Sequence, residues 1–242
     1  LNVNIECGST HIEKLQKLVK ENHLDVGFAF DGDADRCIAV DAKGRVITGD
    51  HIMYVCAKYM QDKGQLGDSK VVTTVMSNLG LYKALDELGI GYEKTAVGDK
   101  YVAENMRANG HLLGGEQSGH IIFGRFANSG DGILTAIKVM EVLTETKQPL
   151  SALAAPMVVY PQILKNVVVT DKEETMQCKE VLDAVKKVED ELGDNGRVLL
   201  RPSGTEPLLR VMVEAGKLET CEAKADEIIA AMDAAGRLIE VK

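Results

Sequence analysis

The sequence predicts an α/β fold, made of a three-layer α/β domain with a mostly parallel mixed sheet and a smaller α+β domain. Two observations predict it. From about residue 46, apolar strand-like segments alternate with segments of helical spacing, which is typical of helices packed over a parallel sheet. Beyond Pro156 and Pro161, paired strands with long helices replace this alternation, which indicates a separate antiparallel unit.

Residues 1–45 form a first section, in which a helix over 10–22 precedes two or three strands. Apolar residues recur at helical spacing behind Thr10, a candidate N-cap. The segments "DVGFAFD" and "CIAVDAKGRVI" follow as buried strands. So short a section has too little apolar area for its own core. We therefore expect it to pack against a further piece of the same protein or against a second chain, a homodimer being one option.

Residues 46–157 make up the predicted three-layer domain. Its expected helices cover 50–62, 78–88, 100–109 and 131–146, and its strands cover 70–75, 91–95 and 111–116. The last helix carries an apolar stripe of helical spacing, which we expect to face the core: Ile133, Ile137, Met140 and Leu143.

Residues 158–242 make up the predicted α+β domain. Its strands are expected at 166–170, 197–201, 208–215 and 238–241, and its helices at 172–192 and 219–235.

Composition excludes several classes of function. A net charge of -9 repels a phosphate backbone, so nucleic acid is not an expected partner. The sequence has no 18-residue apolar run, so we expect no membrane span. Its five cysteines show no C-x-x-C spacing, and we read them as reduced thiols of a cytoplasmic protein.

The stretch "DGDADR" places Asp31, Asp33 and Asp35 in alternation with two small residues, directly after an apolar strand. Three carboxylates that face a common point repel one another unless a cation lies between them. Ligands that are all oxygen favour Mg²⁺ over zinc or copper. A calcium EF-hand does not fit, because Arg36 and Ala42 occupy the loop positions that require Gly and Glu. The alternative reading is a solvated acidic turn.

The stretch "LLRPSGTEPLLRV" gathers residues suited to a phosphate dianion between two apolar strands. Two guanidinium groups, two hydroxyl groups and a glycine that lets backbone N–H groups approach are typical of such a site, and these are Arg201, Arg210, Ser203, Thr205 and Gly204. The alternative is a plain hairpin turn, in which Pro and Gly serve geometry alone.

The stretch "GGEQSGHIIF" predicts a tight hairpin tip that presents polar groups to a sugar. Glu116 and Ser118 suit vicinal hydroxyl groups, and His120 is a candidate proton carrier, although a single His beside a strand is more often structural. In "TAVGDKYV", Lys100 stands at a helix start, where the macrodipole disfavours a cation. A bound phosphate would explain it, and an exposed lysine is the alternative.

Taken in order, D-G-D-A-D-R, G-E-x-S-G-H and R-P-S-G-T-E-P resemble the α-D-phosphohexomutase superfamily over essentially the whole chain. The wording of "TAVGDKYV" and "GGEQSGH" looks most like the bacterial phosphoglucosamine mutase branch. That branch converts glucosamine 6-phosphate to glucosamine 1-phosphate, through a phosphoserine enzyme and a bisphosphate intermediate, for cell-wall precursor synthesis. The resemblance implies an intramolecular phosphotransferase with a TATA-box-binding-protein-like last domain. It also implies that residues 1–45 are the C-terminal part of an incomplete α/β domain, whose partners would be the missing N-terminal domains of the same protein.

The resemblance also implies roles for particular residues. Asp31, Asp33 and Asp35 would bind Mg²⁺, with Arg36 beside them. Lys100 and His120 would join Arg36 in catalysis, and Glu116 and Ser118 would hold the hydroxyl groups of a hexosamine phosphate. The non-reacting phosphate would be gripped by Arg201, Ser203, Gly204, Thr205 and Arg210.

One departure from the family pattern concerns the nucleophile. The family uses a phosphoserine in a T-A-S-H-N-P type loop, and no serine of this chain has that context. We therefore expect the 242 residues to be an inactive C-terminal fragment of the enzyme. The alternatives are a phosphomannomutase or phosphoglucomutase, and a non-catalytic module that binds a phosphosugar and Mg²⁺.

Overall fold

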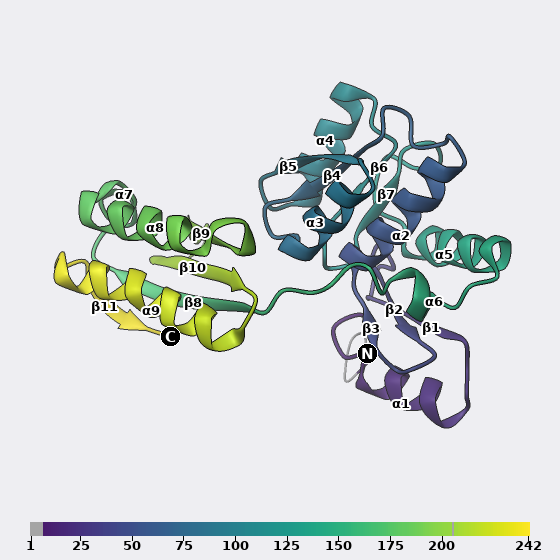
Figure 1. The fold of residues 1–242 in the computed structure, drawn as a ribbon, viewed down its shortest axis with the longest axis horizontal. Coiled ribbons are helices and arrows are strands. Elements are labelled where there is room, and N and C mark those ends of the chain that lie inside the picture. Colours follow the sequence, from purple (N-terminus) through teal and green to yellow (C-terminus); the bar gives the residue numbers. More distant parts are fainter. Residues whose placement is uncertain (1–6, 205) are drawn as a thin grey trace. The chain divides into compact units, whose positions relative to one another are not determined.

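The computed structural model describes residues 7–204 and 206–242, and its contacts divide the chain into two units, Leu1–Val158 and Val159–Lys242 (Figure 1). The first unit holds a three-stranded antiparallel sheet and a four-stranded mixed sheet, and the second holds a four-stranded antiparallel sheet. The predicted fold class, α/β with a smaller α+β unit, is confirmed.

The opening section folds as one helix and a small sheet. Its elements are α1 (Glu13–Glu21), β1 (Val26–Phe30), β2 (Cys37–Asp41) and β3 (Val46–Ile47). The expected cap at Thr10 is wrong, because α1 begins behind Ile12, for which the described residues give no side-chain cap. Asp41 is fully buried in the β2–β3 turn and accepts hydrogen bonds from the Lys43 and Arg45 backbone N–H groups. These bonds fix the turn that connects β2 to β3.

The mixed sheet of the first unit has the strand order β5-β4-β6-β7, with β4 parallel to both neighbours and β7 antiparallel to β6. Its elements are α2 (Gly49–Asp62), β4 (Lys70–Thr74), α3 (Leu79–Glu87), β5 (Gly91–Thr95), α4 (Asp99–Asn109), β6 (Leu113–Gly115), β7 (Ile121–Phe123), α5 (Gly132–Thr146) and α6 (Leu150–Leu153).

Alternate residues of these strands enter two different cores, which gives the unit its three layers. Val71, Ile121 and Phe123 pack with the helices α2, α3 and α5. Their neighbours Val72 and Ile122 point to the other face and pack with residues of α4. Because side chains alternate across a strand, both faces of an apolar strand must be covered, and helices on both sides cover them.

The predicted apolar stripe of α5 is wrong at Ile133, Ile137 and Met140, whereas Leu143 is partly buried and packs against the core as expected. Ile133 and Ile137 are more than half exposed and Met140 is also exposed, whereas Ala136, Val139 and Val142 are buried. The helix packs on α2 and β2 through these smaller side chains. The helical period was read correctly, but two stripes of apolar residues share this helix, and the sequence does not say which one faces the core.

The second unit is an antiparallel sheet of order β11-β8-β10-β9 with helices α8 and α9 packed against it. Its elements are β8 (Gln162–Val169), α7 (Lys172–Gln177), α8 (Lys179–Leu192), the 3₁₀ helix η1 (Gly193–Asn195), β9 (Gly196–Pro202), β10 (Leu208–Ala215), α9 (Leu218–Ala234) and β11 (Leu238–Val241). The single helix expected over 172–192 is two helices, because Cys178 has an extended backbone (φ -65°, ψ 124°).

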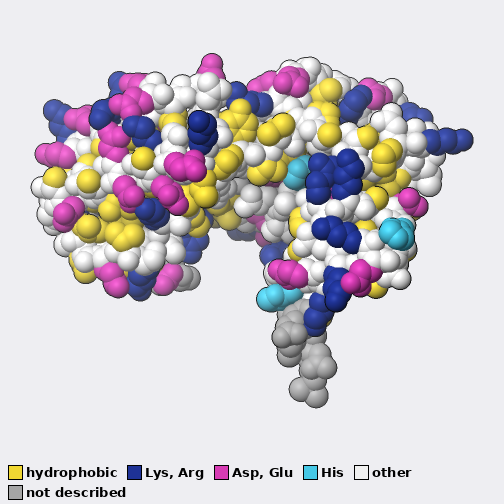
Figure 2. Space-filling view, turned by 60° about the horizontal axis from the view of Figure 1, so that its bottom comes forward, with side chains coloured by type: hydrophobic (Ala, Val, Ile, Leu, Met, Phe, Trp, Pro, Cys, Tyr) yellow, Lys and Arg dark blue, Asp and Glu magenta, His cyan; other side chains and the backbone are white. Residues whose placement is uncertain are grey.

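The surface of the second unit mixes both signs of charge, as the face shown in Figure 2 illustrates. Ion pairs contribute to this pattern, for example Lys165–Asp226 at 2.5 Å. None of the helices in the described ranges combines the length and apolar character needed to cross a bilayer.

Candidate functional site

The loop between β1 and β2 carries the three aspartates and holds a strained backbone. Ala34 has φ 59°, in the left-handed region that residues with a Cβ rarely adopt. Its N–H group donates to the Asp31 carbonyl at 3.2 Å, which closes a tight turn. Carboxylate oxygens of Asp31, Asp33 and Asp35 lie within 4.8 Å of one another. Backbone strain of this kind persists only where the surrounding structure fixes it. In this loop, the strained turn lies among the three acidic side chains whose carboxylates come close together.

The acidic cluster fits a divalent cation. Burial, followed by the hydrogen bond and charge of Asp31, raises the pKa of the Asp35 carboxyl group. Asp35 Oδ1 is buried and has no hydrogen-bond partner in the described part of the chain. A hard cation such as Mg²⁺ would offset the repulsion among the three carboxylates, and the buried Asp35 oxygen could coordinate it. The donor set, which is all carboxylate, agrees with that ion rather than with zinc.

Arg36 links the acidic loop to the second motif. Its N–H group donates to Asp31 Oδ1 at 3.1 Å, and its Nε lies 3.7 Å from Asp31 Oδ2. Its backbone forms an isolated antiparallel bridge with His120. The Cys37 N–H group also donates to the Gly119 carbonyl at 3.0 Å. Backbone pairing therefore brings the "DGDADR" and "GGEQSGH" stretches together.

His120 lies between two carboxylates. Its side chain is 4 % exposed, and Nε2 is 3.6 Å from Asp35 Oδ2 and 3.8 Å from Asp99 Oδ2. The Gly130 N–H group donates to Nε2 at 3.2 Å, so in this arrangement the proton of the ring belongs on Nδ1. Asp99 was not among the residues predicted for the site. Its position beside Lys100 in "TAVGDKYV" is the signal that could have found it.

The hairpin tip holds Glu116 and Ser118 close together. Glu116 Oε1 accepts a hydrogen bond from the Gly98 N–H group at 3.1 Å, and Ser118 Oγ is 3.5 Å from Glu116 Oε2. The tip rests on the start of α2, where a Cβ on Gly49 would lie 2.0 Å from the Glu116 carbonyl oxygen. Only glycine allows this approach. The carboxylate and hydroxyl groups are thus held on one short turn.

Lys100 lies in the first turn of α4, and its side chain points largely into solvent. It is 73 % exposed and its Nζ is 3.8 Å from Glu104 Oε1. An exposed pair of this kind holds a side chain weakly. Lys100 is therefore the predicted site residue of this unit that the structure ties least to the others.

In the second unit, Arg201 and Arg210 are direct cross-strand partners on β9 and β10. The Nε atoms of both are buried and have no hydrogen-bond partner among the described residues. Burial, and after it the charge of Arg210, lowers the pKa of Arg201. Two crowded guanidinium groups whose Nε donors are unsatisfied among the described residues have the chemistry that an anion site needs.

The loop that follows β9 is braced by a lysine. Lys172 Nζ donates to the Ser203 and Glu206 carbonyl oxygens at 2.9 and 3.1 Å. Ser203 is buried, and its Oγ accepts from the Glu206 N–H group at 3.3 Å. Gly204 is exposed, and Thr205 lies outside the described residues. In the described part of the loop, Ser203 is therefore fixed at the base and Gly204 is open to solvent.

A cavity of about 250 Å³ lies elsewhere in the first unit, near α2, α5 and the loop after β7. Its lining includes Tyr59, Phe126 and Lys138, and it contains none of the predicted site residues. The acidic loop and the hairpin tip, rather than this cavity, hold the groups that could do chemistry.

Comparison with protein families gives three matches along the chain. The models described as phosphoglucomutase/phosphomannomutase alpha/beta/alpha domain II, alpha/beta/alpha domain III and C-terminal domain match residues 4–44, 48–160 and 164–231.

Curated relatives share much of the sequence. The chain is 62 % identical over 228 residues to a phosphoglucosamine mutase of Lachnospira eligens, covering 94 % of this chain and 51 % of that protein. It is 58 % identical to a phosphoglucosamine mutase of Oceanobacillus iheyensis, covering 96 % of this chain and 52 % of that protein. The chain thus spans about half the length of the curated relatives it matches.

Solved structures share the fold at low sequence identity. An Aspergillus fumigatus N-acetylphosphoglucosamine mutase in complex with GlcNAc-6P and magnesium has a TM-score of 0.77 at 21 % identity, over 95 % of this chain and 57 % of that one. A phosphoglucomutase/phosphomannomutase family protein from Burkholderia thailandensis has a TM-score of 0.76 at 23 % identity, over 94 % of this chain and 50 % of that one.

Proposed function

Because this chain belongs to the phosphoglucomutase/phosphomannomutase family, we propose that the full-length protein is a phosphoglucosamine mutase. It would convert glucosamine 6-phosphate to glucosamine 1-phosphate. The names and the 62 % and 58 % identities of the two bacterial relatives support this substrate. The phosphoserine that the family uses would lie in the half of the relatives that this chain does not match.

The contact that carries the proposal is the 3.6 Å approach of His120 Nε2 to Asp35 Oδ2. It joins an acidic cluster suited to a metal with a hairpin suited to sugar hydroxyl groups. A phosphoryl transfer to a sugar requires both a cation near the phosphate and a group that handles the hydroxyl proton.

Asp31, Asp33 and Asp35 would hold Mg²⁺, and the magnesium complex of the Aspergillus protein supports the choice of ion. When bound, the ion supplies positive charge that offsets the charge of the transferring phosphoryl group. Arg36, already paired with Asp31, would add a guanidinium group beside the phosphate.

The hairpin would orient the sugar and move its proton. Glu116 and Ser118 would accept and donate hydrogen bonds to neighbouring hydroxyl groups of the hexosamine. His120 would take the hydroxyl proton on Nε2 once the Gly130 N–H group releases its hydrogen bond to that atom, and Asp35 and Asp99 face the charge that then forms. Lys100 would move from solvent toward the substrate phosphate, since its exposed side chain is free to turn.

The second unit would grip the phosphate that does not react. Arg201 and Arg210 would supply the charge, and Ser203, Gly204 and Thr205 would supply hydroxyl and backbone N–H donors. That phosphate would stay bound at this loop while the other end of the sugar receives a phosphoryl group from the phosphoserine. The bisphosphate would then turn round, so that its other phosphate returns to the serine.

The test is a mutase assay of the full-length protein with glucosamine 6-phosphate, glucose 1-phosphate and mannose 1-phosphate in parallel. We expect the highest kcat/KM on the glucosamine substrate. Glu116→Gln should lower kcat/KM by about tenfold or more, because a hydrogen bond to a charged group is lost. Glu104→Gln is the control, because Glu104 pairs only loosely, at 3.8 Å, with Lys100.

A preference for glucose or mannose would replace this function with that of another member of the family. No turnover on any of the three sugars would favour the non-catalytic binding module.

A further inference from the structure

A row of three polar side chains crosses the sheet of the second unit. Asn166 of β8 is the direct partner of Arg210 of β10, and Arg210 is the direct partner of Arg201 of β9. Directly opposed residues of antiparallel strands project to the same face. The adjacent residues of these strands, Val167, Leu209 and Leu200, pack in the core with the helices. Asn166 therefore shares the helix-free face with both arginines.

Among the described residues, the two Nε atoms and the Asn166 amide of this row have no hydrogen-bond partner. The Nε atoms of Arg201 and Arg210 are buried and unsatisfied within the described part of the chain. The Asn166 side chain is half-buried and makes no hydrogen bond to the described residues. Neighbouring strands are about 4.8 Å apart, so an anion above the central strand β10 lies between Arg201 on one side and Asn166 on the other.

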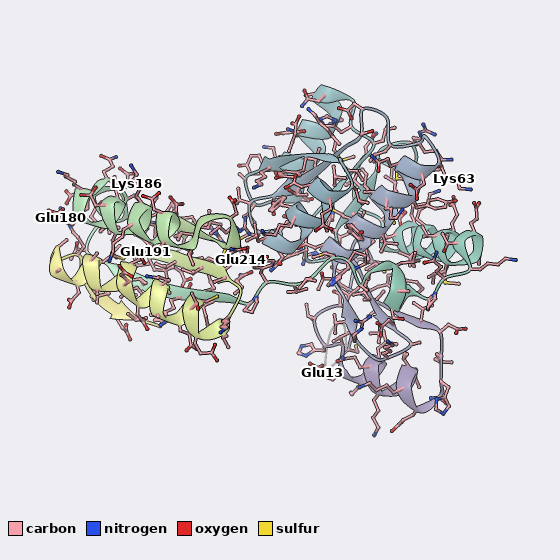
Figure 3. The ribbon with its side chains drawn as sticks, in the orientation of Figure 1. Glu13, Lys63, Glu180, Lys186, Glu191 and Glu214 are labelled. Carbon is pink, nitrogen blue, oxygen red and sulfur yellow. The ribbon has the colours of Figure 1, made fainter. Side chains whose placement is uncertain are left out.

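The same face shows what a structural pair looks like. Arg197 lies four residues before Arg201 on β9, and Glu214 lies four residues after Arg210 on β10. These two residues form an ion pair at 2.5 Å, in which Glu214, labelled in Figure 3, is buried. A carboxylate there neutralises its arginine. An amide at position 166 accepts a hydrogen bond but carries no charge, so the positive charge of the row stays available to a ligand.

We propose that Asn166 is a third ligand-binding side chain for the anion held by Arg201 and Arg210. With the anion bound, its carbonyl oxygen would accept from the Arg210 guanidinium group, a bond that the described residues do not make, because arginine offers donors only. This fixes the amide so that its NH₂ group faces the open side and donates to an anion oxygen. The inference deepens the proposed function and rests on it, since the anion would be the non-reacting phosphate of the sugar.

The experiment measures binding of inorganic phosphate, and separately of glucosamine 6-phosphate, to the 242-residue chain by calorimetry. Three variants are compared: Asn166→Ala, Asn166→Asp and the control Gln162→Ala. Gln162 lies on the same strand and face but opposite Glu214. Unfolding in urea checks that each variant folds.

We expect Asn166→Ala to weaken phosphate binding about tenfold, and Gln162→Ala to leave it unchanged. Asn166→Asp should weaken it further, because its carboxylate repels the anion and pairs with Arg210. A merely structural role predicts the opposite order, since Asp keeps the acceptor that orients Arg210. Binding by Asn166→Asp as tight as by Asn166→Ala, unchanged binding in both variants, or no phosphate binding by the unaltered chain would overturn the inference.

Phosphate binding needs no turnover, so its result is separate from the mutase assay. A protein without mutase activity that shows the expected order would contradict the proposed function and retain Asn166 as an anion ligand. An active mutase in which both Asn166 variants bind phosphate normally would support the proposed function and overturn the role of Asn166 as an anion ligand.

Discussion

Arg201 and Arg210 face each other as direct partners on adjacent antiparallel strands, with both Nε atoms buried and unpaired among the described residues. Like charges in this position destabilise a sheet. Four residues away on the same strands, Arg197 and Glu214 form an attractive pair in the same geometry. The contrast indicates that the repulsive pair serves a ligand rather than the fold.

We predict that Arg201→Gln raises the stability of the protein without ligand and weakens its stabilisation by phosphate. Removing the repulsion between Arg201 and Arg210 should increase the free energy of unfolding by at most about 1 kcal/mol. Phosphate should raise the unfolding midpoint of the unaltered chain, because it binds only the folded state, and should raise that of the variant less. Urea unfolding with and without phosphate measures both effects.

Arg197→Gln is the matched control, and its expected sign is opposite. It leaves the buried Glu214 carboxylate without its charge partner, which should lower the stability. If Arg201→Gln destabilises the ligand-free chain as Arg197→Gln does, the repulsion argument is wrong.

We predict that Gly132→Ala disturbs the acidic loop. The Gly132 N–H group donates to the Ala34 carbonyl at 2.9 Å, and a Cβ on Gly132 would lie 2.5 Å from the Arg36 carbonyl oxygen and 2.8 Å from that of Ala34. Backbone must move to admit it, at a cost of about 1–3 kcal/mol. Calorimetry should show weaker Mg²⁺ binding, and urea unfolding should show the lower stability.

Gly216→Ala is the control for this change, since a Cβ there meets no described atom within 4 Å. Equal Mg²⁺ affinity in the two variants would contradict the role of Gly132 in holding the loop.

Glu93 predicts a pH dependence of stability. Hydrogen bonds from Asn105, then from Lys70, and a smaller contribution from His111 lower the pKa of Glu93 to about 2, against a burial effect that raises it. A carboxyl group whose pKa is lower in the folded state stabilises the protein above its unfolded pKa of 4.5. This contribution is lost as the pH falls from 4.5 toward 2.

The measurement is urea unfolding between pH 2 and 7 of the unaltered chain and of Glu93→Gln. The variant should be less stable at pH 7 and should lose less stability over the acid range. Glu104→Gln, which removes an exposed carboxylate, is the comparison. Identical acid slopes for Glu93→Gln and the unaltered chain would contradict the prediction.

The order of helices and strands could be predicted because the periods of the apolar residues are clear. Two failures have physical reasons. Cys178 breaks a helix within an apolar stripe that continues on both sides, so periodicity alone does not reveal it. In α5, Ala136 and Val139 are buried in place of Ile133 and Ile137, because close packing on α2 and β2 selects the smaller side chains.

The motifs of the candidate site could be found in the sequence, but its geometry could not. The bridge between Arg36 and His120 joins residues far apart in the chain, and no local pattern encodes it. The proximity of Asp99 to His120 follows from the same packing. Asn166 stands inside a strand with no turn or motif around it, and only the strand register shows its place beside Arg210.

A calorimetric titration of the chain with Mg²⁺ tests the central claim most directly, with Asp33→Asn and Asp25→Asn as a matched pair. Both aspartates are exposed, but Asp25 stands at the other end of β1 from the acidic cluster. We predict that the unaltered chain and Asp25→Asn bind one Mg²⁺ with the same affinity, and that Asp33→Asn binds it at least about tenfold more weakly. Absence of binding by the unaltered chain, or equal affinities in the two variants, would contradict the assignment of Asp31, Asp33 and Asp35 as the metal site.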